Sequence, residues 1–443
     1  MASYLYRQTT VPTSEKKFTI STWMKISADT SVEKGIIEWY RSANDRYQVL
    51  IDTTGKMRIH SQVGGSTGIN IYTDMLFRDP ASWYNICIHN DTAESSATDR
   101  FKLWVNGEAQ TFSTYSYTYN GSNINCFDGT SGDAVNVGVR DETSSKFFDG
   151  SLADTYYVDG SLIAYTQFGQ TDSTSGIWKP NLSPTISSFG NAGFHLKYEN
   201  SGNLGLDSSG NSLNMTASGT ITQNVDTPSN NFATWNPLIP QGLAYANGNL
   251  SVTHDASSWK TAYGTLAMSG TGKYYFESKV SALGSYQGIG IVDAEQISAS
   301  ASKFGAESRG YGYKNDASKT NNNSDASYGA TYTTGDIIMC AVDLNAGAIW
   351  WGKNGTWLNS ATQSEIEAGT TTNAGYTSIS NSYVYLPAVQ IYGSGTNQLN
   401  AGSGYFGTTQ VASAGTAPSG GGVFEYDCPT NYQSLSTKGI NSF

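Results

Sequence analysis

The sequence predicts an all-β protein made of two antiparallel β-sandwiches in tandem, and three observations support this prediction. Only 14% of residues are charged, while 48 Gly and 29 Tyr residues, with frequent Ser, Thr and Asn, punctuate short aromatic and β-branched runs. The 443 residues suit two domains of about 200 residues better than one core. A phrase of bulky strand residues leading into Asn-Gly occurs twice, as LWVNGEAQTF at 103–112 and IWWGKNGTW at 349–357.

The first strand series begins at Phe18 and consists of apolar runs bounded by turn-rich residues. Side chains alternate within the runs, so that Phe101, Leu103 and Val105 share one face, as expected where a sheet buries one side. Hairpins are expected at 52–57 and 106–109, because Asn, Asp and Gly accept the positive φ of tight turns. The predicted strands of this half are 18–26, 35–41, 46–52, 57–63, 83–90, 100–105, 134–139 and 153–158.

The alternation of apolar and polar residues is lost between about residues 214 and 248. This segment contains Pro228, Pro237 and Pro240, which lack the backbone N–H that a sheet needs for its hydrogen bonds. We therefore expect a domain boundary near Asp226. The predicted division is an N-terminal arm (1–17), a first sandwich (18–225), a linker (226–248) and a second sandwich with a C-terminal tail (249–443). The strands expected in the second sandwich are 249–254, 264–268, 272–280, 288–293, 310–315, 335–344, 347–355 and 385–393, with polar loops at 315–329 and 362–377.

Charge and composition exclude several classes of partner. The net charge is −11 without a Lys/Arg cluster to offset it, so we expect no nucleic-acid partner. No apolar run approaches the roughly 20 residues that cross a bilayer, and no secretory leader is recognisable, so we expect no membrane span. Four widely spaced cysteines (Cys87, Cys126, Cys340 and Cys428) indicate free thiols in a reducing cytosol.

Several segments resemble known families. FTISTWMK, WYNICIH, FKLWVNG and FDGSLADTYYVDG resemble the laminin-G-like, concanavalin-type jelly rolls of viral structural proteins. In the second half, GKYYFESKV, GIGIVD, GYGY, GDIIMCAVDLNAGAIWWGKNG and YLPAVQIYG follow one another as in a SPRY domain. The segments DTPSNNFATWNPL and FEYDCPTNYQSLSTKGI are similar to parts of virion and tail-fibre-type proteins of marine tailed phages.

The resemblance implies a non-enzymatic phage virion surface protein, either a tail fibre or a capsid fibre or decoration component. Such a protein would be made in the host cytoplasm and would sit on the virion surface beside other virion proteins. Its expected ligand is a host-surface glycan, and its expected state is a homo-oligomer, with a trimer favoured. The alternatives are a secreted carbohydrate-binding module and a polysaccharide depolymerase.

Catalytic and metal sites are not expected. Concanavalin-type glycosidases place two carboxylates on one strand in an E-x-D-x-x-E pattern, and this pattern is absent from the sequence. The nearest match, Glu365 and Glu367, falls in a predicted polar loop. Laminin-G-like domains often carry calcium at a loop end, but this half offers scattered carboxylates such as Asp149 and Asp154, so calcium stays an alternative to the expectation of no cofactor.

Aromatic side chains are therefore the predicted ligand-binding or assembly residues, because Trp and Tyr rings stack on sugars while their polar tips form hydrogen bonds. Trp351 shares a face with Ile349 and is expected in the core, so Trp350 is expected to point outward. The row that includes Tyr117 alternates on one side of a Ser/Thr-rich segment, where burial against a neighbouring subunit is an equal alternative. The predicted binding residues are Trp350, Tyr117, Tyr115, Tyr119 and Trp39.

Overall fold

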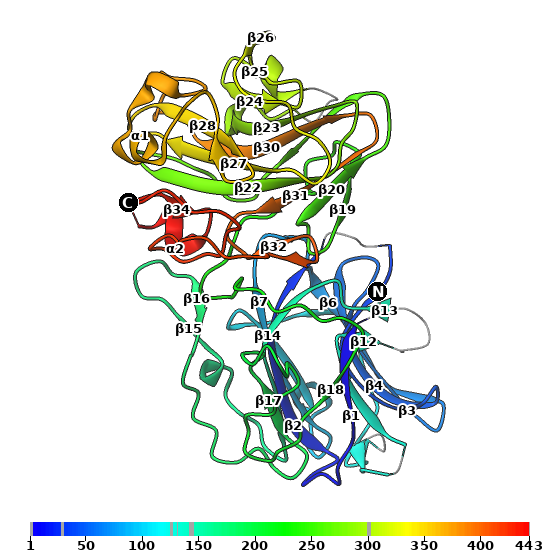
Figure 1. The fold of residues 1–443 in the computed structure, drawn as a ribbon. Coiled ribbons are helices and arrows are strands. Elements are labelled where there is room, and N and C mark those ends of the chain that lie inside the picture. Colours follow the sequence, from blue (N-terminus) through cyan, green and yellow to red (C-terminus); the bar gives the residue numbers. More distant parts are fainter. Residues whose placement is uncertain are drawn as a thin grey trace. The chain divides into compact units, whose positions relative to one another are not determined.

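The computed structural model describes residues 3–27, 31–124, 127–130, 132–140, 146–298 and 303–442. Their regular secondary structure is almost entirely β, which confirms the predicted fold class (Figure 1). The chain divides into two compact units, residues 1–223 and 224–443, and each is a two-layer sandwich. Within the described ranges, no helix has the length and apolar character that crossing a bilayer requires.

The first unit packs an eight-stranded antiparallel sheet against a six-stranded one, counted over the described residues. The larger sheet has the order β10-β6-β5-β4-β3-β11-β1-β18, formed by Phe112–Tyr117, Ser66–Leu76, Lys56–Val63, Asp45–Ile51, Lys34–Ser42, Ala134–Val137, Tyr4–Gln8 and Thr216–Ser218. The smaller sheet has the order β17-β14-β2-β7-β8-β9, formed by Phe194–Leu196, Gly150–Asp159, Lys17–Ile26, Tyr84–Asp91, Phe101–Val105 and Glu108–Ala109. Short elements are β12 (Val139–Arg140), β13 (Lys146–Phe147), β15 (Gly169–Thr171), β16 (Trp178–Pro180), η1 (Ala97–Asp99) and η3 (Tyr165–Gln167).

Alternating apolar side chains from both sheets fill the space between them. Phe18 and Ile20 come from β2, and Val49 and Ile59 come from the facing sheet. The opposite side chains of each strand point away from this core, as the period of two predicts. The outer sheet faces are therefore where polar residues of the strands collect.

The second unit repeats this two-layer design with its own strand order. One sheet runs β19-β20-β31-β22-β27-β28-β29, with β34 parallel to β22, and consists of Ala244–Ala246, Ser251–His254, Gly395–Asn400, Lys273–Ala282, Ile337–Asp343, Ala348–Lys353, Thr356–Trp357 and Gln433–Ser434. The other runs β21-β30-β23-β24-β25-β26 and consists of Trp259–Tyr263, Tyr385–Tyr392, Tyr286–Asp293, Gly310–Lys314, Ser318–Asn321 and Ser324–Ser327. The remaining elements are β32 (Tyr405–Phe406), β33 (Thr409–Gln410), η4 (Ala294–Gln296), η5 (Phe304–Ala306), η6 (Thr371–Asn373), α1 (Gln363–Ala368) and α2 (Thr437–Ile440).

The repeated Asn-Gly phrase forms the same hairpin turn in both units. Asn106 and Gly107 have φ angles of 49° and 81°, and Asn354 and Gly355 have 49° and 83°. Two consecutive positive φ angles define the two-residue turn whose twist matches antiparallel strands. The turns join β8 to β9 and β28 to β29, so the predicted hairpin at residues 106–109 is confirmed.

Two segments that the sequence placed outside the sandwiches, the arm and the linker, belong to them. The predicted arm contributes β1, which pairs with β11 and β18. The predicted linker, although it lacks a strand before β19, buries Phe232, Ala233 and Trp235 in the second unit. The C-terminal tail likewise buries Phe424 and Tyr432.

Local predictions also failed where tertiary pairing decided the structure. The strand expected at 264–268 is wrong, because the chain pairs one segment earlier, as β21 with β30. The polar loop expected at 315–329 is a hairpin of β25 and β26, turned by Asn322 and Asn323 at positive φ. The other expected loop contains α1, whose capping box joins Thr362 and Glu365. Cys87, Cys340 and Cys428 are buried free thiols, and Cys126 lies outside the described residues.

Candidate functional site

The predicted aromatic binding residues are mostly core residues. Trp350 is fully buried, so the prediction of an exposed ring is wrong. Its side chain does point away from Ile349 and Trp351, but it enters a second apolar layer that contains Tyr275, Phe424 and other side chains. The tail and the segment around α1 provide this layer. The strand is therefore buried on both faces.

The predicted tyrosine row and Trp39 also face inward. Trp39 is buried, with its ring 4.6 Å from that of Phe127. Tyr117 is buried and donates to the Asn90 Oδ1 atom at 3.0 Å, and burial raises the pKa of its phenol. The predicted outward orientation is therefore wrong. The strand β10 lies at the edge of its sheet, and the face that carries Tyr115 and Tyr117 is turned toward the core.

The two neighbours in the row behave similarly. Tyr119 is buried, with its hydroxyl 3.0 Å from the Ser61 hydroxyl. Tyr115 is half-buried and donates to the Ala97 carbonyl at 2.6 Å. Both rings pack against the first core. These tyrosines therefore do not form an outward-facing row that a ligand could contact.

A polar row that the sequence did not reveal crosses the outer face of the eight-stranded sheet. Antiparallel register aligns one side chain from each of seven neighbouring described strands. The central members accept and donate to one another, since Gln48 donates to Glu38 and accepts from the Arg140 guanidinium at 3.1 Å. The row reads Tyr6, Asn136, Glu38, Gln48, His60, Asn70 and Ser116.

We call these seven residues the polar row. Its central side chains are buried, although they lie on an outer face of the sheet. Glu38, Gln48, Asn136 and His60 are each at most 5% exposed. The Asn136 Oδ1 and His60 Nδ1 atoms have no hydrogen-bond partner among the described residues. Buried polar atoms are usually satisfied, so two unsatisfied atoms in one row point to a polar function.

Ion pairs border the polar row. Glu33 pairs with Arg140, with Lys146 at 3.0 Å, and with Arg58 at 4.0 Å. Arg58 also donates to the Asn70 Oδ1 atom at 3.1 Å, and its guanidinium lies 5.2 Å from the centre of the Tyr72 ring. Arg58, Glu33 and Lys146 are partly exposed and can meet a ligand directly, whereas Arg140 is buried.

His60 is held in its neutral form. Burial and the charges of Arg58, Arg46 and Arg140 lower its pKa to about 4. A neutral imidazole both donates and accepts a hydrogen bond. The row therefore combines amides, carboxylate, imidazole and guanidinium groups, which suit a ligand rich in hydroxyl groups.

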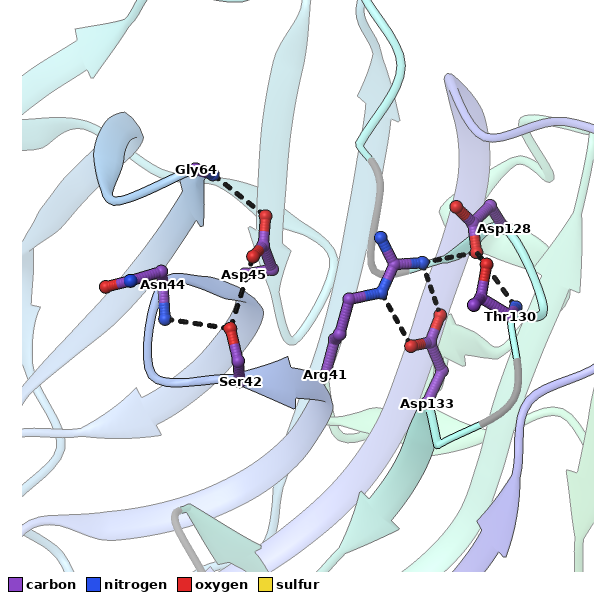
Figure 2. A network of polar contacts seen from close by, with 8 residues as sticks. All are labelled: Arg41, Ser42, Asn44, Asp45, Gly64, Asp128, Thr130 and Asp133. Carbon is purple, nitrogen blue, oxygen red and sulfur yellow. Dashed lines mark hydrogen bonds and ion pairs between the residues drawn. The ribbon is translucent and has the colours of Figure 1, made fainter.

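At the loop end near β3, an arginine lies between two carboxylates. The guanidinium of Arg41 forms ion pairs with both Asp128 and Asp133, and Asp45 is bonded instead to Ser42 and the Gly64 amide (Figure 2). Burial alone would raise the pKa of Asp128, but the hydrogen bond and charge of Arg41 help to lower it to about 2. The guanidinium supplies the positive charge that two neighbouring carboxylates need.

Metal ligation gains no support elsewhere. Across the residues that the structure describes, no three His, Cys, Asp or Glu side chains gather as a metal cluster would require. Asp154, considered as a calcium ligand, lies 3.1 Å from the His195 Nε2 atom.

The polar row could not be predicted from the sequence, because its members are far apart in the chain. Each strand shows the alternation, but only the register shows that Glu38 lies beside Gln48 and Asn136. The sequence contained part of the signal for the polar row. The polar positions of RYQVLID and MRIHSQV include Arg, Gln and His, and a strand face that only meets solvent does not require these residue types. Glu33 directly precedes β3, and Arg140 directly follows the strand predicted at 134–139, so neither was part of a predicted alternation.

Comparisons with known proteins agree with the two-unit architecture. Residues 3–164 match the family described as the concanavalin A-like lectin/glucanases superfamily, and residues 273–371 match the SPRY domain family. A Ran-binding proteins 9/10 homolog of Drosophila melanogaster is 34% identical over 131 residues, which are 27% of this chain and 13% of that protein. The chain thus matches a small part of that relative's length.

Solved structures of similar fold have low similarity to the whole chain. The SPRY domain of human HERC1 is 16% identical, with a TM-score of 0.30, over 37% of this chain and 96% of that domain. The SAP-like pentraxin of Limulus polyphemus is 16% identical, with a TM-score of 0.28, over 37% of this chain and 73% of the pentraxin chain. The two family matches show that the chain contains a laminin G-like, concanavalin A-like domain followed by a SPRY domain.

Proposed function

We propose that this protein binds a glycan without cleaving it, and that the polar row of the first unit is the binding face. The observation that carries the proposal is the continuous row of buried amide, carboxylate and imidazole groups on an outer sheet face. Sugar hydroxyls need fixed donors and acceptors of this kind. The partly exposed Arg58 and Tyr72, and Tyr6 with 40% of its surface exposed, provide the border that a sugar would contact.

The carboxylates of the site favour binding over hydrolysis. A glycosidase needs one carboxyl group that can donate a proton and a second that attacks or activates water. Glu38 is fully buried and accepts from Gln48, and Glu33 is paired with Arg140 and Lys146. Both carboxylates are engaged in fixed contacts within the protein.

The biological setting that we propose is the surface of a tailed-phage virion, as a tail fibre or a capsid fibre or decoration component. There the protein would contact other virion proteins, form a trimer and attach the particle to a host-surface glycan. The support is the resemblance of the segments at 226–238 and 424–440 to phage virion proteins. A virion density map that contains this chain beside a three-fold axis is the expected result.

The binding face is tested with full-length variants on an array of neutral and acidic polysaccharides. Arg58→Ala removes a charged donor at the border of the polar row, and it should weaken binding roughly tenfold, because hydrogen bonds to charged groups contribute about 1.5–3 kcal/mol. Lys102→Ala is the matched control, since Lys102 is exposed on the other sheet. Its binding should equal that of the wild type.

The contradicting results are equally specific. Binding by Arg58→Ala at wild-type strength, with an unchanged melting temperature, would exclude the polar row. Release of reducing sugar ends by the wild type, lost in Glu38→Gln, would show hydrolysis instead of binding.

A further inference from the structure

Three aromatic rings meet on the outer face of the six-stranded sheet of the second unit. Trp259 on β21 and Tyr286 on β23 both lie opposite Tyr392 on β30, which runs between them. The neighbouring Ile391 and Ile289 enter the core, so the three rings project from the other side of the sheet. We call Trp259, Tyr286 and Tyr392 the aromatic triad.

The aromatic triad forms one compact surface. The ring centres are 5.4 Å apart for Trp259 and Tyr392, 6.1 Å for Trp259 and Tyr286, and 6.2 Å for Tyr286 and Tyr392. The outer two strands are separated by a whole strand, so their rings must lean toward each other over Tyr392. A triangle of this size matches one sugar ring rather than an extended chain.

The triad is accessible, unlike most aromatic side chains of this unit. Tyr286 is 46% exposed, and Trp259 and Tyr392 are half-buried. By contrast Tyr263, on the same face of β21, is covered by the segment that contains Phe304. Among the residues that the structure describes, the covering segment therefore leaves this end of the face open.

A cation lies beside the triad. The Lys303 ammonium is 6.0 Å from the centre of the Trp259 ring, within the range of a cation–π contact. It forms no ion pair with the residues that the structure describes, and the nearby Asp325 is paired with Lys314 at 2.7 Å. In a protein of net charge −11, this unpaired positive group favours an anionic ligand.

We propose that the aromatic triad binds a single acidic sugar, with its ring stacked on Trp259 and Tyr286 and its carboxylate facing Lys303. The stacking uses the apolar face of the sugar, and the ammonium selects the acidic sugar over its neutral counterpart. Ser285, directly before Tyr286, and Ser394, two residues after Tyr392, are exposed and provide hydroxyl groups at the border. This second site does not depend on the proposed function of the polar row.

The test compares D-glucuronic acid with D-glucose, using saturation-transfer NMR and tryptophan fluorescence on the full-length protein. The wild type should bind glucuronic acid more tightly than glucose. Tyr286→Ala and Trp259→Ala should each weaken glucuronic acid binding roughly tenfold, and Tyr286→Phe, which keeps the ring, should stay within about twofold. Lys303→Ala should bind the two sugars equally.

Control variants separate this site from the first one. Arg58→Ala should retain the glucuronic acid contact of the triad, whatever its effect on polysaccharide binding. Tyr286→Ala removes an exposed ring and should keep the wild-type melting temperature, so a binding loss there reports on contact rather than folding. The proposal is overturned if Tyr286→Ala binds like the wild type, if neither sugar binds, or if the substitution changes only the oligomeric state in light scattering.

Discussion

The imidazole of His60 links the stability of the first unit to pH. Its folded pKa of about 4 lies below the ordinary value of 6.5, because of burial and three arginines. Between these values the unfolded chain binds a proton that the folded chain does not, so the free energy of unfolding should fall as the pH drops from 6.5 to 4. Above 6.5 this contribution is fully present.

The variant His60→Gln tests this link, because it keeps a polar side chain in the row without an ionisable group. Urea denaturation at about pH 7 and about pH 4.5 should show a smaller loss of stability for the variant than for the wild type. Equal losses in the two proteins would mean that other groups cause the pH dependence.

Trp350 shows how far single residues could be predicted from the sequence. Alternation correctly placed it opposite Ile349 and Trp351, since a strand has no other choice. Its exposure could not be predicted, because the residues that cover it, including Phe424 and Tyr432, lie about 70 to 80 positions later in the chain. The alternation of side chains along a strand predicts which side of the sheet a residue faces. Only the tertiary fold determines whether that side is covered by other residues.

At the scale of elements, the two Asn-Gly turns allow a matched comparison. Alanine at Gly107 or Gly355 meets a positive φ, which costs roughly 1–2 kcal/mol. A Cβ at Gly107 would also lie 2.5 Å from the Trp178 ring, whereas at Gly355 the nearest atom, on the Tyr426 ring, is 3.0 Å away. Gly107→Ala should therefore destabilise its unit more than Gly355→Ala destabilises the other.

Chemical denaturation of both variants, each compared with the wild type, measures the difference. Equal losses of stability would show that the turn conformation alone decides the cost and that Trp178 moves freely. A larger loss in Gly355→Ala would contradict the packing described around Trp178.

Elements could be predicted where the signal is local and not where pairing is distant. The hairpin after β8 follows from two residues, Asn106 and Gly107, so the sequence was sufficient. The strand β21 was missed in favour of residues 264–268, because both segments carry apolar residues. Only β21 forms a continuous ladder with β30, whereas Met268 forms an isolated bridge to it. The polar row depends on six such pairings and was invisible for the same reason.

At the scale of the whole second unit, one buried carboxylate holds the C-terminal segment to the sheet. Glu277 on β22 accepts hydrogen bonds from the backbone of Glu425 and Tyr426 at 2.9 and 2.8 Å, and also from Tyr275 and Asn400. Burial raises its pKa to about 7. The carboxylate thus satisfies four donors from three parts of the chain.

Glu277→Ala should leave these donors without an acceptor and should lower the free energy of unfolding by at least about 3 kcal/mol, because each buried unsatisfied group costs about 1–3 kcal/mol. Limited proteolysis should then cut the C-terminal segment sooner than in the wild type. A variant that resists the protease as the wild type does would show that apolar packing of Phe424 and Tyr432 suffices to hold the segment.

The strand β1 gives the first unit a particular order of assembly. Its residues 4–8 lie between β11 and β18, so one neighbour is supplied near residue 135 and the other near residue 217. During synthesis this strand leaves the ribosome before either of its partners, and more than 200 further residues follow before both of its edges can be paired. Pairing across such separations is slow, since the closure entropy of a long loop precedes any gain from contacts. The nascent chain therefore carries an open strand edge until the residues near 217 have been made.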